Sequence, residues 1–119
     1  MALGLMITRA LAAADRLAAN GISVEIIDPR TIAPLDTETI LNSVAGTGRL
    51  LILDEAFGPC GIGAEIAATI GESGFDELDA PIRRLNGVFA PTPYSPPLEK
   101  AIVAQVEDIV RAIQDLIED

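Results

Sequence analysis

The sequence is poor in the residues that most often perform catalysis or bind metals. Among its 119 residues it has no histidine, no tryptophan and a single cysteine, Cys60, and aromatic residues make up only 3%. Without histidine, the chain cannot form a Ser–His–Asp or Cys–His relay from its own residues. A single cysteine excludes an internal disulfide, and the lack of histidine also excludes an ordinary zinc site. The composition therefore predicts no catalytic or metal site of these kinds.

Basic residues are scarce as well. Eight Lys and Arg residues stand against 18 Asp and Glu residues, which gives a formal net charge of −10. Phosphate backbones and anionic membranes require a basic surface, so we expect no nucleic-acid partner and no membrane partner. A basic protein partner fits this charge, because opposite charges speed the encounter of two proteins.

Long apolar runs are also absent. No run approaches the ~20 residues that span a bilayer. The first sixteen residues, MALGLMITRALAAADR, lack the basic region that opens a signal peptide, and we expect a helix there instead. Together with the single cysteine, this predicts a cytoplasmic location.

Half of the residues are apolar, and their spacing alternates between helical and strand periodicity. The pattern predicts helices over residues 5–20, 37–44, 62–70 and 106–117, and strands over residues 22–28, 50–53 and 81–85. Such alternation indicates an α/β fold in which helices cover both faces of a mostly parallel sheet, giving three layers. At this length we expect one domain over residues 1–119. The opening MALG is typical of the end of a strand whose body lies outside this chain.

A glycine-rich turn follows the most apolar of the predicted strands. Gly61 and Gly63 lie where a dinucleotide-binding fingerprint would begin, but Ile66 occupies the third glycine position. The glycines are interpreted as allowing a tight turn and close helix packing; the alternative is that the helix start contacts an anion or a partner. Glu55, at the carboxyl edge of the sheet, faces a neighbouring site or hydrogen-bonds an adjacent loop.

The segment APTPYSPPLEKA, residues 90–101, holds four prolines and the only tyrosine, Tyr94. Proline removes a backbone donor, so this segment can cross a surface without inviting strand pairing. We expect the segment to wrap along the domain, with Tyr94 as an anchor, and to hold the last helix and the acidic tail at a subunit interface. A simple ordered loop is the alternative.

Several segments together resemble one family. IDPRTIAPLD, GRLLILDEAFGPCGIGAEIA, PYSPPLEKA and VEDIV are similar to the C-terminal domain of the β subunit of thiamine-diphosphate-dependent 2-oxo-acid dehydrogenases, of the pyruvate, acetoin or branched-chain type. That domain has the transketolase C-terminal domain fold, and the resemblance covers nearly the whole chain. It implies a five-stranded, mixed and mostly parallel sheet between helix layers.

The resemblance also implies a role. In that family this domain is a non-catalytic assembly domain, and thiamine diphosphate and Mg belong to the full enzyme, outside this domain. The implied partners are the dehydrogenase α subunit, a second β subunit and the basic binding domain of the acyltransferase core. The assembled enzyme would carry out oxidative decarboxylation of a 2-oxo acid and acylate a lipoyl group, while the isolated chain is expected to be inactive.

The candidate interface and docking residues follow from this resemblance. They are Tyr94, Pro96, Pro97, Glu99, Asp115, Glu118 and Asp119. Relative to the family, the strand before the first helix is cut to MALG and an edge strand is absent, so we expect a fragment or a truncated gene product with an incomplete sheet. Gln105 stands where a serine cap is usual, which predicts a poorer start for the last helix, by ~1 kcal/mol.

Two other functions stay open at this point. The first is the C-terminal part of a split transketolase or deoxyxylulose-phosphate synthase, in which Arg30, Arg83 and Arg84 would be the cations available for a sugar phosphate. The second is an independent α/β ligand-binding module, which would need a closed sheet from this chain alone.

Overall fold

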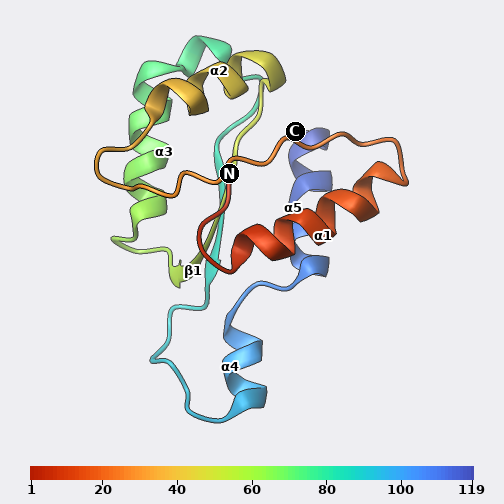
Figure 1. The fold of residues 1–119 in the computed structure, drawn as a ribbon, viewed down its shortest axis with the longest axis vertical. Coiled ribbons are helices and arrows are strands. Elements are labelled where there is room, and N and C mark those ends of the chain that lie inside the picture. The colour runs from red at the N-terminus through yellow and green to blue at the C-terminus, as the bar shows by residue number, and fades with distance from the viewer.

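The structure is a computed structural model that describes residues 1–119 (Figure 1). Its elements, in chain order, are α1 (Met6–Ala18), α2 (Thr37–Thr47), β1 (Leu51–Phe57), α3 (Ile62–Ser73), the 3-10 helix η1 (Phe75–Glu77), β2 (Arg83–Gly87), α4 (Pro96–Ile102) and α5 (Val106–Glu118). Each predicted helix is present, and the α/β class is confirmed. No helix is long and apolar enough to cross a membrane.

The sheet is centred on β1. On one side β1 pairs in parallel with β2, with Leu51 opposite Arg83. On the other side the first three residues lie along β1: Ala2 forms a parallel bridge with Leu53, and the Leu3 N–H donates to the Leu53 carbonyl at 3.0 Å. The opening residues therefore extend the sheet, as the sequence predicted for a strand end.

Helices cover both faces of β1, which gives the predicted three layers. Helices α1 and α5 lie on one side in Figure 1 and α2 and α3 on the other. Successive residues of β1 point to opposite faces, so Leu53 packs with Ile109 on the α1–α5 side, whereas Ile52 packs with Ile66 on the α2–α3 side. All four side chains are buried, and the two apolar clusters together form the core of the domain.

The predicted strand over residues 22–28 is wrong. The segment is extended and its apolar side chains are half-buried, but it forms no strand. Its backbone bond to the sheet runs from the Ala2 N–H to the Ile27 carbonyl, at 3.0 Å. A strand needs a neighbour paired along its length, whereas residues 23–28 make only this one backbone hydrogen bond.

The boundaries of two other strands also differ from the prediction. The strand predicted over 50–53 continues to Phe57, and the one predicted over 81–85 covers Arg83–Gly87 instead. Asn86 and Gly87 therefore belong to β2 rather than ending it. A side chain at Gly87 would place its Cβ 2.2 Å from the Glu55 carbonyl oxygen, so only glycine fits at this point of the sheet.

Carboxylates that accept backbone N–H groups stabilise the starts of two helices, α2 and α5. Asp36 caps α2 as predicted: its carboxylate accepts the Thr39 backbone N–H at 3.0 Å and the Thr39 hydroxyl at 2.6 Å. These two bonds hold the pKa of Asp36 below its usual value. At α5 the Asp108 carboxylate accepts the Gln105 backbone N–H at 2.9 Å, so an acidic residue inside the helix supports its start.

Candidate functional site

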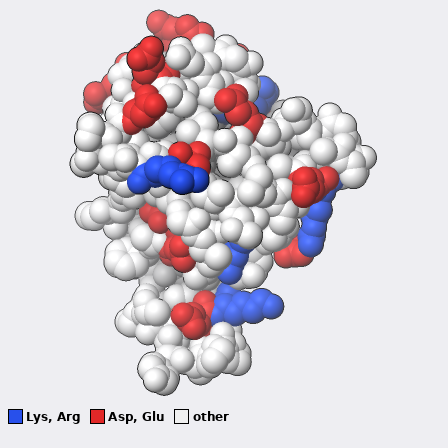
Figure 2. Space-filling model, in the orientation of Figure 1, with Lys and Arg blue, Asp and Glu red and all other residues white.

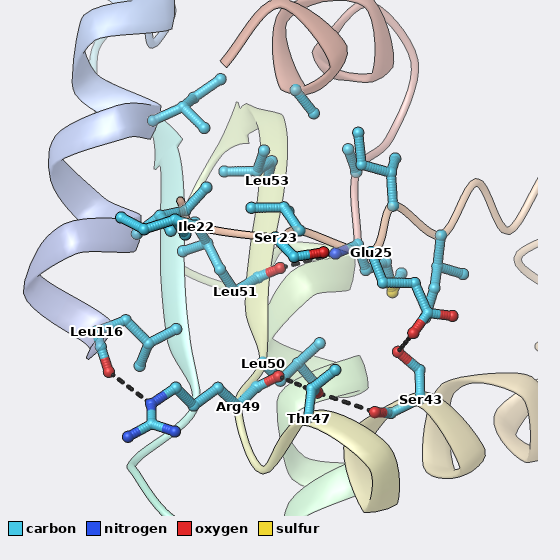
Figure 3. A pocket seen from close by; sticks show the side chains of 18 of the residues that line it. Ile22, Ser23, Glu25, Ser43, Thr47, Arg49, Leu50, Leu51, Leu53 and Leu116 are labelled. Atoms are coloured by element: carbon cyan, nitrogen blue, oxygen red, sulfur yellow. Dashed lines mark hydrogen bonds between the residues drawn. The ribbon is translucent and has the colours of Figure 1, made fainter. Parts of the chain in front are cut away.

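A cleft lies in the sheet, between β1 and residues 22–27. Its cavity volume is about 280 Å³, and most of the residues that line it are apolar. Residues 22–25, among them Ile22, Ser23 and Glu25, line the cleft together with Leu51 and Leu53 of β1 (Figure 3). Helix α5 contributes Leu116, and α2 contributes Ser43 and Thr47 at the rim. We call this feature the sheet cleft.

The Met1 amino group lies at one end of the sheet cleft. It donates to the Leu51 carbonyl oxygen at 2.9 Å, next to the bonds that Ala2 and Leu3 form with β1. Burial removes water from the ammonium and lowers its pKa from 8.0 to about 6, although the Glu25 carboxylate opposes this effect. The buried amine thus has one backbone acceptor and one nearby carboxylate.

The other polar groups of the sheet cleft are held at its rim. The Ser43 hydroxyl donates to the Glu25 carboxylate at 3.0 Å. The Arg49 guanidinium donates through Nε to the Leu116 carbonyl at 3.0 Å, which ties the start of β1 to the end of α5. The charged groups around the cleft are therefore the Met1 amine, Arg49 and Glu25, a local excess of positive charge in a chain of net charge −10.

A second feature is an exposed apolar surface at the α4 end of the molecule. The residues of this end surface are Phe57, Val88, Phe89, Tyr94 and Leu98. Phe89 is 71% exposed, and its ring meets that of Phe57 edge-on with centroids 5.2 Å apart. Figure 2 shows mostly uncharged surface around α4, whereas acidic groups gather over the opposite end. Apolar patches that a monomer leaves exposed commonly mark interfaces.

The structure places four of the predicted interface residues beside this end surface. Pro96 and Pro97 open α4, where proline is favoured because the first helical N–H groups have no partner inside the helix. Glu99 lies in the first turn of the same helix, and Pro96, Pro97 and Glu99 are all exposed. Tyr94 is fully exposed, at 102%, so the prediction that it anchors the segment to its own domain is wrong.

The three acidic residues predicted for docking lie elsewhere. Asp115, Glu118 and Asp119 are at the end of α5, about 20 Å from its start by the helical rise. Arg83 donates to Asp119 through Nε at 2.9 Å and lies 3.7 Å from Asp115. Two of the three carboxylates are therefore paired within the chain, and the structure does not bring this acidic group together with Tyr94.

The turn predicted at the carboxyl edge of the sheet has mainly internal contacts. The Glu55 carboxylate accepts the Leu5 backbone N–H at 2.9 Å, which supports the start of α1 and matches the hydrogen-bonding interpretation. A Cβ at Gly63 would lie 3.4 Å from Ile52, and one at Gly61 would lie 2.8 Å from the Phe57 carbonyl oxygen. These distances agree with a tight turn and close helix packing; contact with an anion or partner stays a prediction.

The cations considered for a sugar phosphate all have partners in the chain. Arg30 pairs with Asp28 at 2.9 Å, Arg83 pairs with the end of α5, and Arg84 donates to the Gly58 carbonyl at 3.2 Å. No group of three or more His, Cys, Asp or Glu side chains is arranged to hold a metal ion. The geometry thus favours an interaction role over phosphate binding.

Sequence reasoning missed two features of the site. It did not single out Val88 and Phe89, although an apolar pair between a predicted strand and a proline-rich segment is a signal for exposed apolar side chains. It also did not identify the residues that line the sheet cleft, such as Ser43, because they come from separate elements and share no sequence motif.

Comparison with known proteins identifies the family. The model of the transketolase C-terminal domain matches residues 1–109. The chain belongs to this family. Related proteins include the mitochondrial pyruvate dehydrogenase E1 component subunit beta-2 of Oryza sativa subsp. japonica, which is 50% identical over 90% of this chain and 28% of its own length. The pyruvate dehydrogenase E1 component subunit beta of Rhizobium meliloti (strain 1021) is 43% identical over 93% of the chain and 24% of its own.

A third relative comes from a different dehydrogenase. The acetoin:2,6-dichlorophenolindophenol oxidoreductase subunit beta of Bacillus subtilis (strain 168) is 41% identical over 98% of this chain and 34% of its own length. The transketolase C-terminal-like chain thus spans about a third of the length of the curated relatives it matches. These relatives are β subunits, as the resemblance in the sequence predicted.

Proposed function

We propose that this chain is a non-catalytic assembly domain of the β subunit of a thiamine-diphosphate-dependent 2-oxo-acid dehydrogenase. The observation that carries the proposal is the end surface, where Phe57, Phe89 and Tyr94 expose aromatic rings at one end of a small domain. The relatives, which are β subunits of pyruvate and acetoin enzymes, support the same role. In the full enzyme the reaction would be oxidative decarboxylation of a 2-oxo acid, with acylation of a lipoyl group.

The cofactor would be held by polypeptide outside this chain. Thiamine diphosphate is bound through a divalent cation, which needs a set of oxygen ligands. The residues of this chain do not fit that need, since no cluster of acidic side chains is arranged around a metal position. The cations that could meet a diphosphate, such as Arg83 and Arg84, are already paired.

The proposed partners differ between the two ends of the molecule. The end surface would pack against a second β subunit, because aromatic residues such as Tyr94 are enriched among the few residues that carry most of the binding energy of an interface. The carboxylates at the end of α5, including Glu118, would face the basic binding domain of the acyltransferase core. The α subunit would contact the complete β subunit.

Sedimentation of the purified chain tests this proposal. We expect a concentration-dependent dimer, and we expect Phe89→Ser to weaken it at least about tenfold, since a buried aromatic anchor contributes 2 kcal/mol or more, on the order of a hot spot. Phe75→Ser is the matched control, because Phe75 is 74% exposed but lies in η1, at the other end of the molecule from α4. A chain that stays monomeric at all concentrations, or equal effects of both changes, would refute the proposal.

A further inference from the structure

Helix α4 carries two adjacent residues of opposite charge, Glu99 and Lys100, and both are exposed. Lys100 is the only lysine of the chain. Neither residue takes part in any of the ion pairs within the chain. Residues one apart on a helix do not face each other, so these two charges cannot neutralise one another. Both remain available to a partner.

The other charged groups near Lys100 are engaged within the domain. Glu107, a carboxylate on which the charge of Lys100 acts at longer range, already pairs with Arg16 at 2.8 Å. The rest of α4 is uncharged, and Figure 2 shows mostly uncharged surface around it. Lys100 and Glu99 are therefore a local pair of unmatched charges in an apolar region.

The backbone fixes α4 at its C-terminal end while its side chains stay exposed. The Ile102 carbonyl accepts the Val88 N–H at 2.8 Å, and the Lys100 carbonyl accepts the Gln105 side-chain amide at 2.8 Å. No residue of α4 is buried. The helix thus presents Glu99 and Lys100 from a defined position rather than from a free end.

The charges restrict which partner can cover the end surface. Leu98, a residue of that surface, directly precedes the two charged residues on the same helix. A partner that covers Leu98 would also remove water from Glu99 and Lys100. A charge that loses its water without gaining a partner group opposes association strongly. The partner must therefore bring a cation to Glu99 and a carboxylate to Lys100, side by side.

A second copy of this chain supplies both groups at the required spacing. In an interface with twofold symmetry, if residue i of one copy contacts residue j of the other, then j of the first also contacts i of the second. A twofold axis that passes beside α4, between Glu99 and Lys100, would bring Glu99 of each copy to Lys100 of the other. Two equal ion pairs would form, flanked by the apolar residues of the end surface.

We infer that the end surface binds a second copy of the chain about a twofold axis at α4, with reciprocal ion pairs between Glu99 of each copy and Lys100 of the other. The aromatic residues of the end surface supply apolar contact, and the ion pairs fix the orientation of the two copies. This inference rests on the proposed function, because it specifies the geometry of the same interface.

Charge reversal of each residue alone tests the inference. In Glu99→Lys, two lysines of one copy would face two lysines of the other, and in Lys100→Glu four carboxylates would meet. Like charges placed opposite one another oppose association. We expect each single variant to dimerise at least about tenfold more weakly than the unchanged chain in equilibrium sedimentation.

Two further samples distinguish reciprocal pairing from a general effect of charge. The double variant Glu99→Lys/Lys100→Glu restores both pairs with the charges exchanged, so its dimer should be within about threefold of the original affinity. A 1:1 mixture of the two single variants should form a heterodimer, because all four contacts then join opposite charges. This mixture should associate even though each variant alone is largely monomeric.

Matched controls make the same changes of charge elsewhere. Glu72→Lys alters an exposed residue of α3, and Arg111→Glu alters an exposed residue of α5; neither residue is in an ion pair within the chain. Both variants should dimerise like the unchanged chain. Urea denaturation of every variant confirms that the exposed substitutions leave the domain folded.

The outcomes separate this inference from the proposed function. If Phe89→Ser weakens the dimer but both single charge reversals leave it unchanged, the assembly role stands and the twofold pairing at α4 is wrong. Weakening by the single variants without recovery in the double variant or in the mixture would also overturn the pairing. A chain that is monomeric at every concentration would overturn both proposals.

Discussion

At the scale of single residues, the Met1 amine is a charged group in a buried position. Its pKa falls from 8.0 to about 6 because burial disfavours the charged form. The unfolded chain therefore holds this proton up to about pH 8, while the folded chain releases it above about pH 6. Between these values the unfolded state binds more protons, so the free energy of unfolding rises with pH.

We predict that the chain is more stable at pH 8 than at pH 6, by about 2–3 kcal/mol. No histidine titrates in this range, and a Cys60→Ser background removes the thiol. Urea denaturation at a series of pH values between 5.5 and 8.5 measures the effect. A flat profile, or one that falls as the pH rises, would show that the amine is not buried as described.

Single residues also show how far local chemistry can be read from sequence. The Asp36 cap was predicted because a capping carboxylate accepts a backbone N–H only a few residues along the chain, here that of Thr39. The Tyr94 anchor was predicted wrongly, because exposure depends on where the α4 segment lies relative to the rest of the fold. The bond from Leu5 to Glu55 joins residues 50 positions apart, and the sequence suggested it only as one of two interpretations.

At the scale of elements, the approach of β2 to β1 depends on one glycine. A Cβ at Gly87 would lie 2.2 Å from the Glu55 carbonyl oxygen and 3.2 Å from that of Ile102. Both atoms belong to backbone, so neither can move without shifting a whole segment. Gly87 therefore sets the spacing of the two strands and the approach of the end of α4.

We predict that Gly87→Ala lowers the free energy of unfolding by about 1–3 kcal/mol, the usual cost of overpacking. Gly46→Ala is the matched control: Gly46 lies inside α2 with nothing within 4 Å of an added Cβ. There alanine should raise stability by about 0.5–1 kcal/mol through helix propensity. Chemical denaturation of both variants measures the difference, and two changes of the same sign would contradict this account of the sheet.

Helices and strands could be predicted where the spacing of their own apolar residues determines their structure. Helix α5 repeats apolar residues at helical spacing and was predicted correctly. The apolar run over residues 50–53 predicted the buried part of β1, but not its continuation to Phe57. Residues 22–28 have the alternation of a strand, yet a strand also needs a paired neighbour, which the sequence does not describe. Helix α4 was missed because Pro96 and Pro97 were interpreted as a connector rather than as a helix start.

At the scale of the whole molecule, apolar and acidic surfaces are separated. The end surface lies around α4, and acidic groups gather over the end formed by α2 and α3 (Figures 1 and 2). Such a division suits a domain that meets one partner through aromatic contacts and another through charge. The motifs of the sequence predicted the fold class and the family. The separation of the two surfaces could not be predicted, because it depends on how the helices are arranged in space.

The central claim is that this chain contributes assembly and no chemistry. The most direct test is release of CO₂ from pyruvate by the purified chain, supplied with thiamine diphosphate and Mg²⁺. The account predicts a rate no higher than that of the cofactors without protein. Sustained turnover by the chain without any other subunit would contradict it.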